Sequence, residues 1–261
     1  MPTRISASSY LNTAPLVWSF IYGQNHGRVE IILDNAPARS AELLSETRVD
    51  AALVPVIAYQ SIDDIFLVPD VCVGAHDRVR SVCLATKGVE LKQVRTVALD
   101  ASSRTSVALT KIIFREFLGF EPDWLVSEPD ADKMLAQADC ALIIGDPALR
   151  LADSDHRVFD LAGLWNHYTG LGFVFAMWMS RQEKSPIDFA AARDEGLAHV
   201  EDIVGNYLSE IALARQEMLA YLTQNISYSV DEKMRQGMEL FFKLAQEHQL
   251  IDENKPLRFV G

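Results

Sequence analysis

Four hydroxyl side chains and one arginine stand in a row near the middle of the chain: Ser102, Ser103, Arg104, Thr105 and Ser106. A β-type run precedes this row and a helix-type run with one apolar face follows it, so a helix is expected to begin here. The first N–H groups of a helix lack helical partners and the helix dipole is positive at that end, which suits a carboxylate or a phosphate. Hydroxyl donors and a guanidinium strengthen such a site. A well-capped helix is the alternative; since a cap needs one hydroxyl and not four, we favour an anion-binding site.

The elements around this row occur twice along the chain. The first stretch has predicted strands at 4–8, 29–33 and 50–54 and predicted helices at 17–21 and 38–46. The second stretch has predicted strands at 96–99, 124–126 and 140–144 and predicted helices at 104–118 and 130–138. The strand-like segments 50–54 and 139–143 also share a residue pattern. We therefore predict an α/β protein with two similar β-α-β-α-β lobes.

Two apolar segments, 79–85 and 173–179, are expected to be strands that carry the chain between the lobes. Lobe one would then comprise 1–81 and 177–261, and lobe two would be the inserted segment 82–176. The last part of the chain predicts helices at 188–198, 200–207, 210–222 and 231–247, which would pack on lobe one. In each lobe a polar loop follows the first strand. Because ligands of open α/β sheets bind at the carboxyl ends of strands, the two loops are expected to line one cleft.

Charge and composition exclude several classes of partner. The chain of 261 residues has a net charge of −12, so neither nucleic acid nor an anionic membrane surface is an expected partner. The sequence has no membrane-spanning apolar run and no signal-peptide pattern at its start, and we therefore expect a cytoplasmic protein. The three cysteines form no Cys-x-x-Cys pair and the histidines have no ligand spacing, so we expect buried free thiols and no metal site.

Four blocks of sequence, at 9–16, 100–106, 141–149 and 169–176, resemble the chorismate dehydratase family of the futalosine route to menaquinone. In this order and spacing they cover about the whole chain. The resemblance implies a periplasmic-binding-protein-like fold of the second type, with a ligand cleft between two lobes. It also implies loss of water from chorismate, a dianionic small molecule, to give 3-(1-carboxyvinyloxy)benzoate without a cofactor. One departure is Gly172, where the resemblance implies proline.

The resemblance and the loop positions together assign the candidate site residues. Asn12 and Ser81 are the catalytic candidates, and the role of Ser81 depends mostly on the resemblance. The substrate-binding candidates are Ser8, Tyr10, Thr13, Ser102, Ser103, Arg104, Thr105, Ser106, Gly145, Asp146, Thr169 and Gly170. A simple turn is the alternative for Thr169 and Gly170, and a helix cap is the alternative for Asn12.

The motifs offer no glutamate or histidine as an obvious base. Asp146 follows a strand and is the best carboxylate available, but it could instead cap a helix that begins at Pro147. We therefore expect substrate-assisted proton abstraction, in which the enolpyruvyl carboxylate of chorismate is the base.

Two other functions compete with this hypothesis. One is the related 1,4-dihydroxy-6-naphthoate synthase activity, and the other is a non-catalytic solute-binding protein for small anions. The sequence leaves both a monomer and a homodimer open.

Overall fold

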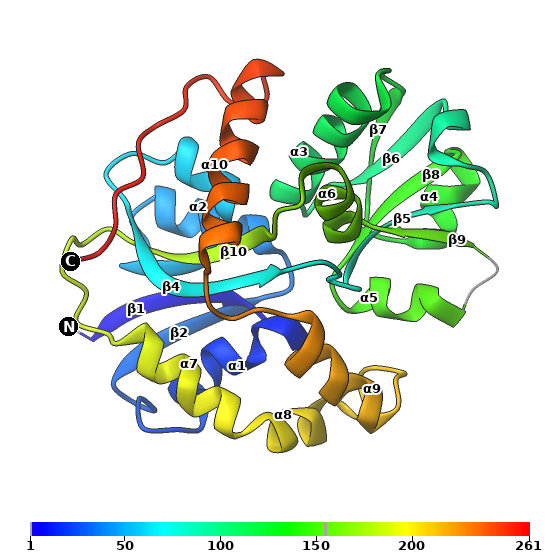
Figure 1. The fold of residues 1–261 in the computed structure, drawn as a ribbon. Coiled ribbons are helices and arrows are strands. Elements are labelled where there is room, and N and C mark those ends of the chain that lie inside the picture. The colour runs from blue at the N-terminus through cyan, green and yellow to red at the C-terminus, as the bar shows by residue number, and fades with distance from the viewer. Residues whose placement is uncertain (1, 154–155) are drawn as a thin grey trace.

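Each of two lobes is built around a five-stranded mixed sheet in this computed structural model, which describes residues 2–153 and 156–261 (Figure 1). The first sheet has the order β2-β1-β3-β10-β4. Its strands are β1 (Thr3–Ser8), β2 (Val29–Asp34), β3 (Ala51–Pro55), β4 (Phe66–Ala75) and β10 (Phe173–Ser180). The second sheet has the order β7-β6-β8-β5-β9. Its strands are β5 (Val82–Thr86), β6 (Thr96–Asp100), β7 (Asp123–Ser127), β8 (Cys140–Ile144) and β9 (Arg157–Asp160).

The two sheets have the same pairing pattern, which confirms the repeat expected from the sequence. Strand β1 pairs in parallel with β2 and β3, and β6 pairs in parallel with β7 and β8. Each sheet then adds an antiparallel strand, β10 in the first and β5 in the second. Because β10 returns to the first sheet after β5 to β9, the second lobe is an insertion between β4 and β10.

The shared residue pattern of the two repeats has a structural cause. Asp50, just before β3, accepts a hydrogen bond from the Arg4 amide at 2.7 Å. Asp139, just before β8, accepts bonds from the amides of Arg95 and Thr96 at 2.9 and 3.1 Å. In both lobes an aspartate at the start of the third strand therefore satisfies N–H groups at the start of the first.

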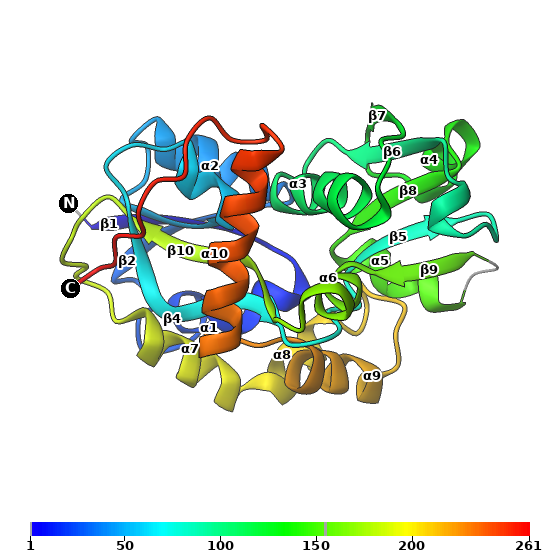
Figure 2. The same cartoon turned by 45° about the horizontal axis from the view of Figure 1, so that its top comes forward.

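Helices cover both faces of each sheet (Figures 1 and 2). Those of the first lobe are α1 (Ala14–Ile21), α2 (Pro37–Ser45), α7 (Phe189–Ala198), α8 (Val200–Tyr207), α9 (Arg215–Ala220) and α10 (Glu232–Glu247). Those of the second lobe are α3 (Thr105–Ile112), α4 (Ala131–Gln137), α5 (Asp146–Leu149) and α6 (Leu161–Thr169). Both views place α10 across β10, with the two termini at the outer end of the first lobe.

Side-chain alternation along the second sheet separates two apolar layers. The sheet face that packs against α4 and α5 includes Cys83, Ala98 and Ile143. The opposite face includes Leu84 and Leu99, and it packs with α3 and α6 in the same apolar core that fills the first lobe. The second lobe thus shares an apolar core with the first on one face only.

A series of aromatic rings connects the lobes through this shared core. Phe117, which follows α3, meets Trp165 of α6 at 6.2 Å between ring centroids, and Trp165 meets Phe173 of β10 at 5.4 Å. Phe173 then meets Phe241 of α10 at 5.1 Å. Edge-to-face contacts of this kind add about 0.5–1.5 kcal/mol each to the area that they bury.

The residue expected to depart from the family pattern, Gly172, lies where the chain returns to the first lobe. Its carbonyl oxygen would be 2.0 Å from a Cβ atom on Gly237 of α10, and its own Cβ would be 2.7 Å from Met234. The two glycines therefore allow the backbones of α10 and the returning segment to touch.

The strand expected at 79–85 begins only at Val82, so the first part of that prediction is wrong. The Ser81 amide donates to the Val79 carbonyl at 2.7 Å, which closes a three-residue turn around Arg80, whose φ is +61°. Strands β4 and β9 and helix α6 also form without having been expected. The predicted helix 210–222 is replaced by α9 and a π-helical turn, Tyr221–Asn225.

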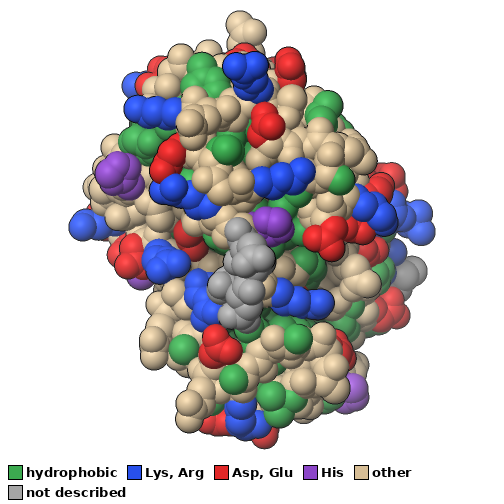
Figure 3. All heavy atoms as spheres, turned by 90° about the vertical axis from the view of Figure 1, so that its right-hand side faces the viewer, with side chains coloured by type: hydrophobic (Ala, Val, Ile, Leu, Met, Phe, Trp, Pro, Cys, Tyr) green, Lys and Arg blue, Asp and Glu red, His purple; other side chains and the backbone are tan. Residues whose placement is uncertain are grey.

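The exposed surface carries charges of both signs. Figure 3 shows the second-lobe end, where basic and acidic side chains are interspersed. Within residues 2–153 and 156–261, no helix has the length and apolar character needed to cross a membrane. All three cysteines are buried free thiols, as expected.

Candidate functional site

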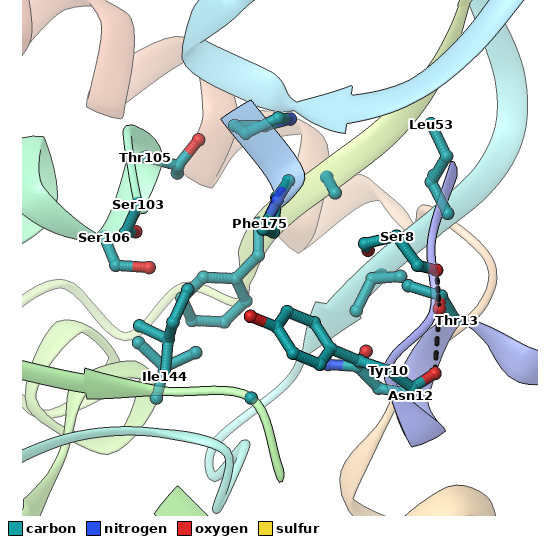
Figure 4. A pocket seen from close by; sticks show the side chains of 16 residues that line it. Ser8, Tyr10, Asn12, Thr13, Leu53, Ser103, Thr105, Ser106, Ile144 and Phe175 are labelled. Carbon is teal, nitrogen blue, oxygen red and sulfur yellow. Dashed lines mark hydrogen bonds between the residues drawn. The ribbon is translucent and has the colours of Figure 1, made fainter. Parts of the chain in front are cut away.

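The loop after β1 brings one set of polar side chains to the cleft. Thr13 holds this loop closed, because its hydroxyl donates to the carbonyl oxygens of Ser8 and Tyr10 at 2.6 and 2.8 Å. Ser8, Tyr10, Asn12 and Thr13 all line the pocket between the lobes. In Figure 4 the Tyr10 ring extends across this pocket toward the second lobe. Burial and the nearby carboxylates raise the pKa of Tyr10 to about 12, so its hydroxyl stays a proton donor.

The loop after β6 brings the second set from the other lobe. Ser103, Thr105 and Ser106 line the pocket and face the β1 loop across it (Figure 4). Helix α3 begins here, and its first helical bond joins the Ala108 amide to the Arg104 carbonyl at 3.1 Å. The preceding N–H groups therefore have no acceptor within the helix. Hydroxyls and the first amides of the helix thus meet at one place, which is the arrangement that an anion site would need.

Two members of the hydroxyl row have other contacts. Ser102 directs both its amide and its hydroxyl to the Asp100 carboxylate, at 2.8 and 2.6 Å, which fixes the shape of the loop. The Arg104 guanidinium lies 3.6 Å from the Glu42 carboxylate of the first lobe. Neither residue lines the pocket. Ser102 shapes the β6 loop, and Arg104 contacts the opposite lobe.

An apolar floor completes the pocket. Its lining includes Leu53, Val73, Val82, Ile144 and Phe175. Phe175 lies between the two polar loops (Figure 4). The pocket measures about 70 Å³, against roughly 300–1,000 Å³ for most small-molecule sites. The lobes are therefore closed upon each other, and a ligand would enter after they separate.

Several polar contacts hold the lobes in this closed arrangement, and three of them involve the β1 loop or the β6 loop. The Leu11 amide of the first lobe donates to the Asp146 carboxylate of the second at 3.2 and 3.4 Å. The Ile57 amide donates to the Thr105 hydroxyl at 3.3 Å. The third contact is the Arg104–Glu42 ion pair described above. Asp146 therefore does not cap α5, whose N-cap is Gly145, and the capping alternative is wrong.

The closed arrangement of the lobes also requires glycine at position 145. Its φ is +67°, a conformation that favours glycine. A Cβ atom there would also lie 2.9 Å from the Tyr10 ring. The tyrosine consequently rests directly on the backbone of the opposite lobe.

Burial has a marked effect on the Asp146 carboxyl. Desolvation raises its pKa from 3.8 to about 6, and the Leu11 hydrogen bond only partly offsets this. The group thus titrates within reach of neutral pH, while its oxygen atoms are directed at the backbone of the β1 loop.

The remaining candidates lie outside the pocket lining. Ser81 is fully buried behind it, although its neighbour Val82 and its hydrogen-bond partner Gly145 both line it. Thr169 and Gly170 end helix α6: the Thr169 hydroxyl donates to the Trp165 carbonyl at 2.7 Å, and Gly170 has a φ of +70°. These contacts fit the alternative interpretation of Thr169 and Gly170, in which they form a simple turn and do not bind substrate.

Sequence reasoning missed most of the apolar lining. Val73 comes from β4, a strand that was not expected, and Leu53 and Phe175 lie in strands that were expected without a site role. The alternation of side chains along those strands could have identified the residues that face the cleft.

The arrangement defines a class of protein: a two-lobed α/β fold of the periplasmic-binding-protein type, with polar strand ends facing each other across a cleft. Two solved structures share this fold. A protein of Archaeoglobus fulgidus matches with a TM-score of 0.71 at 14% identity, over 95% of this chain and 98% of the other. The periplasmic aliphatic sulphonate binding protein of Escherichia coli matches with a TM-score of 0.65 at 15% identity, over 100% and 94%.

The sequence comparison is more specific. The family described as menaquinone biosynthesis matches residues 3–247. A chorismate dehydratase of Thermus thermophilus is 30% identical over 265 residues, which covers 92% of this chain and 94% of that protein. The chain belongs to the menaquinone biosynthesis family.

The raised pKa of Asp146 predicts a pH-dependent stability. Between about pH 4 and pH 6 the folded state binds more protons than the unfolded chain, so stability from this group is lost as the pH rises. Asp146→Asn should therefore gain stability relative to the wild type between about pH 4 and pH 7, by about 2 kcal/mol. Urea unfolding at several pH values measures the difference.

Asp139→Asn is the matched control with the opposite sign. The amides of Arg95 and Thr96 lower the pKa of Asp139, so this variant should lose stability relative to the wild type as the pH rises. The prediction would be contradicted if the difference in free energy of unfolding between wild type and Asp146→Asn were the same at every pH.

Proposed function

We propose that this protein is a chorismate dehydratase, which removes water from chorismate to give 3-(1-carboxyvinyloxy)benzoate in menaquinone biosynthesis. The structural observation that carries the proposal is the pair of polar loops, one from each lobe, that face each other over an apolar floor. Such a cleft suits a ring with charged groups at its ends. The family membership and the Thermus thermophilus relative support the same substrate.

The anion-binding loop would hold one of the two carboxylates of chorismate. Ser103, Thr105 and Ser106 supply hydroxyl donors at the start of α3, together with amides that have no acceptor in the helix. Tyr10 adds a neutral donor from the opposite lobe. Among the residues that the structure describes, no lysine or arginine lines the pocket, so hydrogen bonds and the helix dipole would carry the recognition.

The reaction removes a ring proton beside the enol ether and the neighbouring hydroxyl, and the ring becomes aromatic. The difficult step is the removal of the carbon-bound proton. The ring carboxylate is conjugated to that carbon, so donors on this carboxylate would stabilise the charge that develops. Asn12 or Ser81 would assist the departure of the hydroxyl.

The base would be the enolpyruvyl carboxylate of the substrate itself. Asp146 is the protein carboxylate that the sequence offered as a base, but its oxygen atoms accept hydrogen bonds from the Leu11 amide. In that position it joins the lobes and does not face the pocket lining. Positioning of the substrate and electrostatics would then provide most of the rate acceleration.

A non-catalytic anion-binding protein is the second candidate, because the same fold occurs in the sulphonate-binding protein of Escherichia coli. The related 1,4-dihydroxy-6-naphthoate synthase activity also remains an alternative. The lobe division at 1–81 with 177–261 and at 82–176 is likewise a proposal, although β10 pairs within the first sheet from Phe173 onward. A cytoplasmic location and the choice between monomer and homodimer stay predictions of the sequence.

Incubation of the purified protein with chorismate distinguishes these functions. Mass spectrometry should show a product lighter than chorismate by one water. Binding of chorismate without a product would support the solute-binding alternative. Turnover of a cyclic nucleoside-derived substrate and none of chorismate would support the synthase.

The anion site predicts a loss of affinity when its hydroxyls are removed. Ser103→Ala and Ser106→Ala should each weaken chorismate binding, because a hydrogen bond to a charged group contributes about 1.5–3 kcal/mol, or roughly 10- to 150-fold in affinity. Calorimetric titration measures this. Ser127→Ala is the control, because Ser127 ends the neighbouring strand β7 and its hydroxyl donates to the Glu128 carbonyl at 3.2 Å. Unchanged affinity in both site variants would remove the anion-binding loop from the proposal.

The origin of the base predicts a contrast between two further variants. Asn12→Ala should lower kcat strongly, whereas Asp146→Asn should keep substantial activity because a neutral amide oxygen can still accept the Leu11 hydrogen bond. Steady-state kinetics with chorismate measure both. A fall in kcat of about 10⁴ or more for folded, chorismate-binding Asp146→Asn would identify a base on the protein instead.

A further inference from the structure

Three buried polar atoms of the closed structure make no hydrogen bond of ordinary geometry. They are the Asn12 amide oxygen, the Ser81 hydroxyl and the Tyr221 hydroxyl, and within residues 2–153 and 156–261 none of them has a hydrogen bond of ordinary length and angle. A buried polar group without a hydrogen bond costs about 1–3 kcal/mol, so such groups call for a functional explanation. Here two of the three atoms belong to the proposed catalytic residues.

Tyr221 reaches these residues from the helices at the end of the chain. Its side chain is fully buried. Burial raises its pKa well above the ordinary value and the Asp146 carboxylate adds to this, whereas hydrogen-bond interactions with the Ser81 and Asn12 side chains lower it. The hydroxyl is therefore protonated at neutral pH and lies beside both side chains.

The backbone around Tyr221 is specialised. Helix α9 ends at Ala220 and continues as a π-helical turn, in which the Ile226 amide donates to the Tyr221 carbonyl at 3.2 Å. Turns of this type occur often at functional sites. The Asn225 amide group, at the end of the turn, donates to the Arg78 carbonyl at 3.4 Å. This bond fastens the turn to the segment that contains Ser81.

We propose that Tyr221 is a positioning residue for the dehydration: its hydroxyl donates to the Asn12 amide oxygen and thereby directs the Asn12 amide nitrogen toward the substrate. This inference rests on the proposed function. The Asn12 oxygen is buried, whereas the residue as a whole is 9% exposed, so the exposed atoms are others. An asparagine held in this orientation offers N–H donors to the departing hydroxyl. The Tyr221 oxygen can in turn accept a hydrogen bond from the Ser81 hydroxyl, which holds Ser81, the second catalytic candidate, in place.

Tyr221→Phe tests the proposal because it removes one oxygen and keeps the ring. Turnover of chorismate should fall by roughly 10- to 100-fold in kcat, while KM changes by less than about threefold. In an Asn12→Ala background, followed by single-turnover kinetics, the same change should cost less than about twofold, because the hydroxyl acts through Asn12. Thermal unfolding checks that the fold persists.

Tyr228→Phe is the matched control. Tyr228 is also buried with an unpartnered hydroxyl; burial raises its pKa, and the side chains that add to this shift are Tyr221 and Cys72, not Asn12 or Ser81. It should keep kcat within about threefold of the wild type. Wild-type kcat in Tyr221→Phe, an equal loss in the control, or an undiminished loss in the Asn12→Ala background would each overturn the positioning role alone. Absence of chorismate turnover by the wild type would overturn the proposed function, and this inference with it.

Discussion

The aromatic contact between Trp165 of α6 and Phe173 of β10 fixes the relation of the two lobes. It joins the apolar face of the second sheet to the core of the first lobe, and Phe241 of α10 continues it. The Trp165 indole also donates to the Gly172 carbonyl at 3.2 Å, so the ring is held at the point where the chain returns. Apolar side chains are buried on the side of the molecule where these rings lie. The carboxyl ends of β1 and β6 face each other across the cleft. The cleft exists because only one face of the second sheet is shared.

This arrangement suits the proposed binding of an anion by an acidic protein. The net charge of −12 repels a dianion at long range, but salt screens such repulsion over about 8–10 Å. Inside the closed cleft, the neighbours of the ligand would be hydroxyls, amides and apolar side chains. Hydrogen bonds are stronger in such a low-dielectric space than in water. Local donors would therefore outweigh the overall charge in the proposed complex.

The sequence predicted much of the fold because its signals are local or repeated. Alternating apolar patterns identified the strands of both repeats, and the hydroxyl row marked the start of α3. The sequence could not separate Ser103, which lines the pocket, from Ser102, whose hydroxyl binds Asp100. Their orientation depends on the turn that follows β6, and both residue types suit both positions.

Long-range contacts account for what was missed. Tyr221 lies about 140 residues from Ser81 in the chain and meets it only when the last helices fold back onto the first lobe. The positive φ of Arg80 interrupts a segment whose residues all suit a strand. The Asp146 carboxylate was correctly placed after a strand, but its partner belongs to the other lobe. Residue order alone carries little information about such contacts.

The contact of Tyr10 with Gly145 has a consequence for how this fold can change. The interface at that point has no room for even one methyl group. A larger residue at position 145 would act as a wedge and shift the population from the closed to the open form, although glycine has no side chain to lose and a methyl group adds no donor or acceptor. Closure and recognition can thus be altered separately. A descendant of this protein could become a slower enzyme or a plain binding protein through a substitution at one glycine.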